Sequence, residues 1–213
     1  MPKYKLVIFD LDGTLANSFP WFLRVVNDVA REFGFRPVAP DDIETLRRMG
    51  SREILKFLDV PLWKVPLIAT RMRALKRSHL KDIALFGGAA AMLRSLHDTG
   101  VALALVSSDN EANARLQLGP DTAALFGYFD CGASLFGKAA KFSRLIKRIA
   151  IRPQEALAIG DEVRDFEAAR SAGIAFGAVN WGYADPDTLQ ALKPDEFFTS
   201  FDDIVIGVSE QKR

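Results

Sequence analysis

The sequence predicts an α/β fold: a doubly wound, Rossmann-like core of parallel strands with an inserted block of helices. Short, continuously apolar runs recur along the chain, and a helical pattern precedes three of them. One long stretch after the first run contains helical patterns but no convincing strand. Apolar runs of this length are typical of strands buried on both faces of a parallel sheet. Their alternation with helices favours right-handed crossover connections.

The expected strands follow in order along the chain. The first covers residues 5–9 and ends at an acidic turn that contains Gly13, and the others cover residues 101–106, 156–159 and 174–179, with a short last strand at 197–198. Helical patterns at 89–97, 142–149 and 166–172 precede the second, third and fourth strands, and Gly173 ends the last of these helices.

Residues 17–82 break this alternation. Apolar residues recur at helical spacing from Phe22 to Phe33, and Gly34 follows as a stop signal. Further helices are expected from Asp41 and Asp42 to Met49, after a cap at Ser51, and over residues 66–81. We therefore predict a helical cap formed by residues 17–82. It is inserted into a catalytic core formed by residues 1–16 and 83–213.

Composition excludes several classes of protein. The 213 residues include 28 basic and 27 acidic side chains, so no overall charge attracts nucleic acid. The single cysteine, Cys131, cannot form an intrachain disulfide, and its apolar surroundings indicate a small buried side chain rather than a nucleophile. No apolar run approaches the ~20 residues that span a bilayer, and no signal peptide is recognisable. We expect a soluble, cytoplasmic protein without membrane or nucleic-acid partners.

Asp10 and Asp12 come directly after the first expected strand, in the run Asp-Leu-Asp-Gly-Thr. Residues two apart on an extended chain point the same way, so both carboxylates converge at the edge where open α/β sheets bind ligands. Their repulsion needs a cation or a shared proton. A surface turn or a calcium loop is the alternative, but the ligand spacing of a calcium loop is absent.

Asp161 and Asp165 form a second acidic pair, just after the strand expected at residues 156–159. They are four residues apart and share a face if the turn is helical; alone, they could also be ordinary acids at a helix N-terminus. Because parallel strands end at one edge, this pair is expected to meet Asp10 and Asp12. Four carboxylates in one cleft require a hard divalent cation, and oxygen ligands favour Mg²⁺.

Two further signals concern an anionic ligand. Ser107 and Ser108 end the second long strand, where a hydroxyl and backbone N–H groups are able to hold phosphate oxygens. They are also ordinary turn residues. Lys138 and Lys141 precede the helix at 142–149, and either lysine would offset the acids and a bound phosphate. We prefer Lys138, with Lys141 as the alternative.

In this order, the motif Asp-Leu-Asp-Gly-Thr-Leu, a strand-ending serine, a lysine and Gly-Asp-x-x-x-Asp resemble the haloacid dehalogenase superfamily, specifically its phosphatases. The resemblance covers nearly the whole chain. The helical insertion resembles the cap of the phosphoglycolate phosphatase-like branch. Two departures stand out: the lysine lies in Gly-Lys-Ala-Ala-Lys rather than Lys-Pro, and Ser107-Ser108 replaces the frequent Thr-Asn.

The resemblance implies a Mg²⁺-dependent phosphatase that acts on a small phosphorylated metabolite through an aspartyl-phosphate. Asp10 would be the nucleophile and Asp12 the general acid and base. The metal would be held by the Asp10 carboxylate, the Asp12 main-chain carbonyl and Asp161, with Asp165 in or near the coordination sphere. Ser107, Ser108 and Lys138 would bind the phosphate.

Two other functions use the same scaffold, and the substrate depends on the cap. A sugar phosphomutase would keep Asp10 and Asp12 but return the phosphate to a sugar, and an idle regulatory module would bind phosphate without turnover. Phosphoglycolate is the substrate that the family suggests. Arg52 is the first choice among the cap cations to meet an acidic substrate; the other candidates are Arg47, Arg48, Arg71, Arg73, Lys76 and Arg77.

Overall fold

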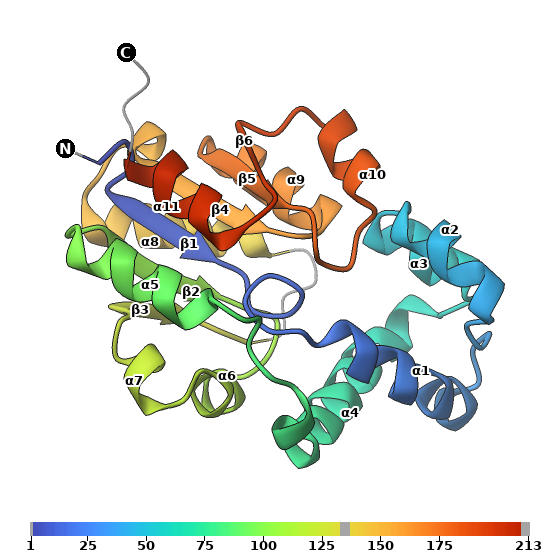
Figure 1. Ribbon diagram of the computed structural model, residues 1–213. Coiled ribbons are helices and arrows are strands. Elements are labelled where there is room, and N and C mark those ends of the chain that lie inside the picture. Colours follow the sequence, from blue (N-terminus) through green and yellow to red (C-terminus); the bar gives the residue numbers. More distant parts are fainter. Residues whose placement is uncertain (1, 133–136, 210–213) are drawn as a thin grey trace.

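The computed structural model describes residues 2–132 and 137–209, and its centre is a sheet of six parallel strands (Figure 1). The strand order is β3-β2-β1-β4-β5-β6. The strands are β1 (Leu6–Phe9), β2 (Ala102–Val106), β3 (Tyr128–Asp130), β4 (Ala156–Gly160), β5 (Ala175–Val179) and β6 (Glu196–Phe198). The predicted doubly wound α/β class is confirmed.

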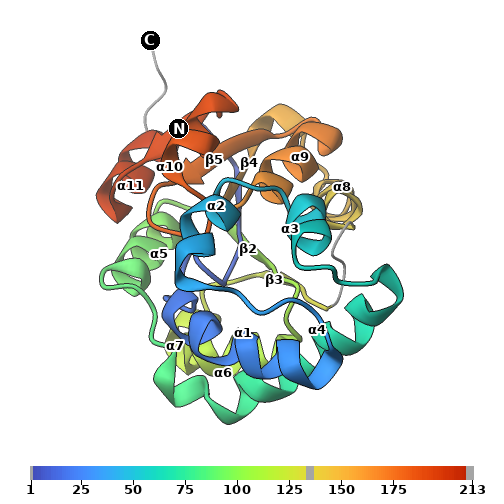
Figure 2. The same cartoon turned by 90° about the vertical axis from the view of Figure 1, so that its right-hand side faces the viewer.

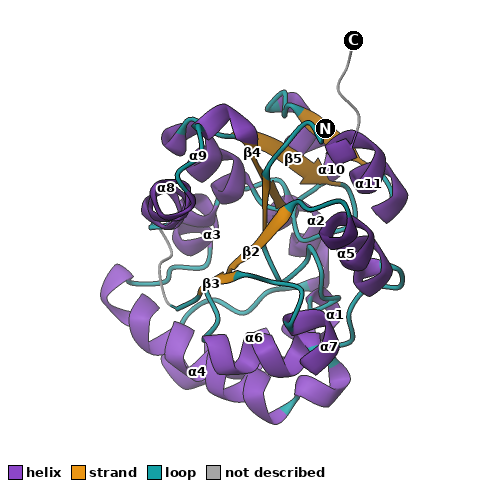
Figure 3. Ribbon diagram, turned by 90° about the vertical axis from the view of Figure 1, so that its left-hand side faces the viewer, coloured by secondary structure: helices purple, strands orange, loops and turns teal. Residues whose placement is uncertain are grey.

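Helices cover both faces of the sheet (Figure 3). Successive residues of a strand face opposite sides, so Val7 and Phe9 pack under α5 (Ala89–Asp98) and α11 (Phe201–Ser209). Leu6 and Ile8 pack on the other side, against α8 (Lys138–Ile149) and α9 (Val163–Ala172). Burial on both faces explains why these strands are continuously apolar in sequence.

The strand order reverses direction at β1. The chain proceeds from β1 to β2 and β3 on one side and then returns to β4, β5 and β6 on the other. Ligands of open α/β sheets bind beyond the carboxyl ends of the strands at such a switch point. Here the two strands at that point are β1 and β4, which register Phe9 beside Ile159, so the residues that follow both strands lie next to each other.

Between β1 and β2, residues 17–82 form helices and no strand, as predicted. The main helices of this helical insertion are α1 (Phe19–Phe33), α2 (Ile43–Arg47), α3 (Ser51–Phe57) and α4 (Val65–Ser78). They pack around their own small core, which includes Val26, Val38, Leu58 and Val60. Figure 2 views the molecule from the side of the insertion, with the sheet behind it.

Several local predictions were wrong. The helix expected to start at Phe142 is α8, which already begins at Lys138. Its N-cap is Gly137, so Lys138 and Lys141 belong to the helix and do not precede it. Gly50, not Ser51, is the N-cap of α3, since the Glu53 carboxylate accepts the Gly50 N–H at 2.8 Å. The helix expected to reach Met49 ends at Arg47 after a 3-10 turn at Pro40–Asp42.

Other elements gave no clear signal in the sequence. They are β3 and the short helices α6 (Glu111–Leu118), α7 (Pro120–Ala123) and α10 (Pro186–Ala191), together with α11.

Within the described residues, no helix combines the length and the apolarity that a membrane span requires. Cys131, predicted to be buried, is only half-buried; it packs against the core, and burial raises the pKa of its thiol to about 11. A raised thiol pKa disfavours the thiolate and agrees with a structural role.

Candidate active site

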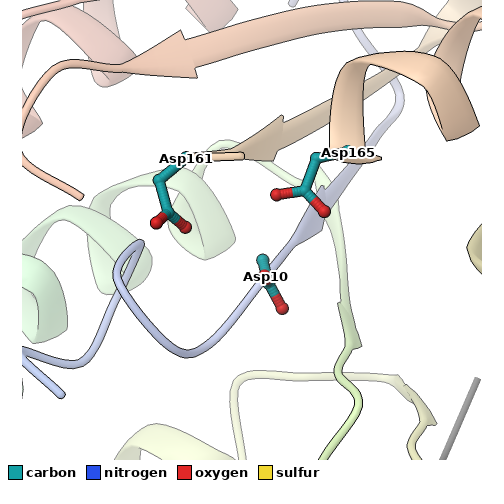
Figure 4. Close-up of side chains that lie close together, drawn as sticks. All are labelled: Asp10, Asp161 and Asp165. Carbon is teal, nitrogen blue, oxygen red and sulfur yellow. The ribbon is translucent and has the colours of Figure 1, made fainter. Parts of the chain in front are cut away.

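Three buried carboxylates meet beyond the ends of β1 and β4 (Figure 4). Asp10 follows β1, Asp161 follows β4, and Asp165 lies in the first turn of α9. One oxygen of each carboxylate lies within 4.8 Å of the others. Their exposed fractions are 5%, 0% and 2%, although carboxylates avoid burial unless they are paired or bound to a metal.

The chain fixes these acids through close backbone packing. The Asp10 N–H donates to the Ile159 carbonyl at 3.0 Å, which extends the strand pairing to the acid itself. Gly13 turns with φ +81°, and a Cβ there would lie 2.1 Å from an Asp161 carboxylate oxygen. The Thr14 hydroxyl donates to the other Asp161 oxygen at 2.7 Å. The Asp-Gly-Thr run is thus built around Asp161, and only glycine fits at its centre.

The electrostatics of the site require positive charge. Burial, and after it the charges of Glu162, Asp10 and Asp165, raise the pKa of Asp161 well above its usual range. Lys138 at the start of α8 supplies one compensating charge, with its ammonium 2.9 Å from Asp10 and in contact with Asp165. Burial lowers the pKa of Lys138, but these two carboxylates outweigh it and raise the pKa above its ordinary value.

The three acids fit a divalent cation. One lysine offsets only part of their charge, and the donor set consists of oxygens, which hard cations prefer. Lys138 pairs with Asp10 and Asp165, and among the described residues no ion pair reaches Asp161. A cation bound among the three oxygens would complete the neutralisation of this buried cluster.

Asp12 lies beside this cluster but does not belong to it. Its side chain is 24% exposed, and both of its oxygens lie 2.7 Å from the ammonium of Lys76 in α4. Lys76 is itself buried and also pairs with Asp109, at 3.0 Å. The charges of Asp12 and Asp109 overcome burial and raise the pKa of Lys76. A lysine of the insertion therefore contacts the carboxylate that was predicted to be the acid and base.

The two candidate lysines occupy different environments. Lys141, one turn beyond Lys138, is buried, and its ammonium donates to the carbonyls of Ser107, Asp130 and Gly132 at 3.0–3.2 Å. Those bonds tie α8 to the ends of β2 and β3. Lys138 contacts the acid cluster, whereas Lys141 contacts these carbonyls and lies 3.7 Å from an Asp130 carboxylate oxygen.

A cavity of about 830 Å³ opens between the insertion and the core. Its lining includes Ser107, Ser108 and Lys138 from the core, and Arg48, Ser51 and Arg52 from the insertion. The Ser107 hydroxyl accepts the Asp109 N–H at 3.1 Å, inside the turn that follows β2. The predicted phosphate-binding residues thus share one cavity with the arginine that was preferred as a substrate contact.

Two other cap cations, Arg71 and Arg47, do not line this cavity. Arg71 pairs with Glu32 within the insertion, and Arg47 donates to backbone carbonyls of the core loop at residues 182–184. Three features of the site were not expected from the sequence: Asp109, the ion pairs of Lys76 with Asp12 and Asp109, and the loop at residues 182–184. Asp109 follows the Ser107-Ser108 pair directly, so the strand end itself was the signal that could have drawn attention to it.

The chain matches the family model described as haloacid dehalogenase-like hydrolase over residues 7–179. A phosphoglycolate phosphatase of Synechococcus elongatus is 31% identical over 208 residues, which cover 97% of this chain and 98% of that protein. A phosphoglycolate phosphatase of Xylella fastidiosa is 30% identical over 194 residues, which cover 84% of this chain and 81% of that protein.

Solved structures with the same fold include a predicted phosphoglycolate phosphatase from Haemophilus somnus, at 23% identity, a TM-score of 0.77 and coverage of 97% and 98% of the two chains. CbbY from Rhodobacter sphaeroides, solved in complex with phosphate, has 20% identity, a TM-score of 0.74 and coverage of 96% and 99%. The matched family model spans most of this chain, including both acidic motifs. The chain therefore belongs to the haloacid dehalogenase-like hydrolases and is a phosphatase-type member of that family.

Proposed function

We propose that this protein hydrolyses a small phosphate monoester with Mg²⁺, through a phosphoryl group carried on Asp10. The observation that carries the proposal is the position of Asp10: it faces Asp161 and Asp165 and is paired with Lys138. In this proposal residues 1–16 and 83–213 form the catalytic core, and residues 17–82 act as the cap over it. The relatives named above make phosphoglycolate the first substrate to test.

In the first step, an Asp10 carboxylate oxygen bonds to phosphorus while the bond from phosphorus to the ester oxygen breaks. Asp12 gives its proton to the departing alkoxide. In the second step, Asp12 takes a proton from water, whose oxygen attacks phosphorus and releases Asp10 and inorganic phosphate. The ion pair with Lys76 fixes where the Asp12 carboxylate lies.

Asp10, the main-chain carbonyl of Asp12, Asp161 and Asp165 would hold the cation. When bound, Mg²⁺ supplies charge neutralisation between the nucleophile and the phosphate dianion. Lys138 and the turn at Ser107 and Ser108 would hold the remaining phosphate oxygens, which supports positioning for in-line attack.

Removal of divalent cations should abolish activity. After EDTA treatment, we expect phosphate release to fall to background and to return when Mg²⁺ is added, because three buried acids would otherwise repel the phosphate. The measurement is inorganic phosphate release from phosphoglycolate across a Mg²⁺ titration. Full activity at a metal-free level verified by elemental analysis would contradict the metal-dependent proposal.

Replacing the two lysines should show which of them acts in catalysis. For Lys138→Met we expect kcat to fall by about 10²–10³-fold, since a charge beside the reacting groups is lost. Its melting temperature should fall as well, because the buried carboxylates of Asp10 and Asp165 lose their partner. For Lys141→Met we expect a loss of about 2–3 kcal/mol of folding free energy with little change in kcat, because three backbone carbonyls lose their donor. Kinetics and urea unfolding of both variants give the test, and a large fall in kcat for Lys141→Met but not for Lys138→Met would make Lys141 the active-site lysine.

The substrate is tested with a panel of phosphoglycolate, sugar phosphates and nucleotides. Arg48 and Arg52 of the insertion line the same cavity as Ser107 and Lys138, which supports an ester with a second acidic group. Arg48 also pairs with Asp185 at 3.6 Å. Preference for a neutral ester over phosphoglycolate would contradict this substrate class, and activation by a sugar bisphosphate would indicate a phosphomutase instead.

A further inference from the structure

Arg47 joins the insertion to the core at the last residue of α2. Its guanidinium donates to the carbonyls of Tyr183 at 3.1 Å, Gly182 at 3.4 Å and Ala184 at 3.5 Å. Its own carbonyl accepts the N–H of Asp185 at 2.8 Å. One residue of the insertion thus contacts four successive residues of the loop that follows β5.

The same loop holds Asp161 from its other side. The Tyr183 N–H donates to an Asp161 carboxylate oxygen at 2.8 Å, and the Ala184 N–H donates to the Asp161 carbonyl at 3.2 Å. The loop and Asp161 are packed tightly against each other, because a Cβ on Gly182 would lie 2.1 Å from the Asp161 Cβ. A displacement of this loop therefore displaces Asp161.

Arg47 and Asp161 bind opposite ends of the same two peptide groups. The peptide that joins Gly182 to Tyr183 accepts from Arg47 through its carbonyl and donates to Asp161 through its N–H. The peptide that joins Tyr183 to Ala184 does the same. A cation on the carbonyl side polarises a peptide and strengthens the hydrogen bond on its N–H side. The guanidinium thus both fixes the loop and improves its donors.

We propose that Arg47 is a positioning residue. When the insertion packs against the core, Arg47 holds the loop at residues 182–185, and this loop holds Asp161 in its cation-binding orientation. The insertion then completes the cation site without supplying a ligand, and a bound cation in turn favours packing of the insertion against the core, since such coupling is reciprocal. This inference rests on the divalent cation of the proposed function. It assigns Arg47 a partner other than the substrate.

The test measures binding of Mg²⁺ alone, without substrate, by isothermal titration calorimetry and by the Mg²⁺-dependent rise in melting temperature. For Arg47→Met we expect the dissociation constant to increase about tenfold, at the lower end of the 10–100-fold seen when groups that support metal ligands are removed. Arg47→Lys, which keeps one charged donor but not the fork, should fall between this variant and the wild type.

Arg71→Met is the matched control, because Arg71 belongs to the same insertion but pairs with Glu32 away from the loop. Its Mg²⁺ affinity should equal that of the wild type. If Arg47→Met does not fold, as its melting curve would reveal, Arg47→Lys carries the test with the same direction of change.

Two results would overturn the inference. Unchanged Mg²⁺ affinity in folded Arg47 variants, with or without a higher KM for phosphoglycolate, would leave the proposed function intact and make Arg47 a substrate contact or a structural residue. Absence of Mg²⁺ binding by the wild type would remove the cation from the proposed function and this inference with it. The two failures are thus distinguishable.

Discussion

Replacing Asp10 by asparagine is expected to abolish phosphate release, with a loss of roughly 10⁴-fold or more in kcat. The size follows from the loss of the nucleophile itself, whose removal is among the most damaging changes in enzymes with covalent intermediates. An amide of the same shape also removes a negative charge from a crowded acidic cluster, so we expect the fold and the melting temperature to be retained.

The matched control for this variant is Asp28→Asn. Asp28 is an exposed acid on α1 that pairs with Arg31 and is not part of the acid cluster. Its kcat should equal that of the wild type. Turnover by Asp10→Asn within tenfold of the wild-type rate would mean that Asp10 does not bond to phosphorus.

Replacing Asp12 by alanine is expected to have the second largest effect, and the effect should depend on the leaving group. General acid–base catalysis contributes about 10²–10⁴-fold, or about 3–5 kcal/mol of barrier. For phosphoglycolate, whose alkoxide is a poor leaving group, both steps should slow. For p-nitrophenyl phosphate, the leaving group needs no proton, so mainly the hydrolysis of the aspartyl-phosphate should slow.

The Asp12→Ala variant should therefore release p-nitrophenolate in a burst that approaches one equivalent per chain, followed by slow turnover. Rapid mixing with absorbance detection measures the burst. The wild type is the reference and should show no comparable burst if its second step is fast. Equal slowing for both esters and no burst would argue against Asp12 as the base of the second step.

The core of the site could be predicted from sequence because its geometry is local. β1 ends at Phe9 and β4 ends at Gly160, so Asp10 and Asp161 follow two neighbouring parallel strands and come to the same sheet edge without further information. The apolar runs were recognisable because both faces of the sheet are covered. β3 was missed because it has only three half-buried residues, too few for any period to stand out.

The contacts between the insertion and the core could not be predicted. Lys76 lies 64 residues from Asp12, and Arg47 reaches carbonyls about 135 residues away. Such contacts depend on how the helical insertion packs against the core, and the periodicity of apolar residues in the sequence does not encode that packing. A buried lysine in an amphipathic helix looks like any solvated one in sequence. Lys76 and Arg47 were therefore visible in the sequence as cations of the insertion, but their partners in the core could not be predicted.

The most direct test of the account is to locate the phosphoryl group. The Asp12→Ala variant is mixed with p-nitrophenyl phosphate and Mg²⁺, quenched in acid during the burst, digested and analysed by mass spectrometry. We expect the mass of one phosphoryl group on the peptide that contains Asp10, and none in the double variant Asp10→Asn, Asp12→Ala. Nitrophenolate release with no phosphorylated peptide, or with the group on another residue, would contradict Asp10 as the nucleophile.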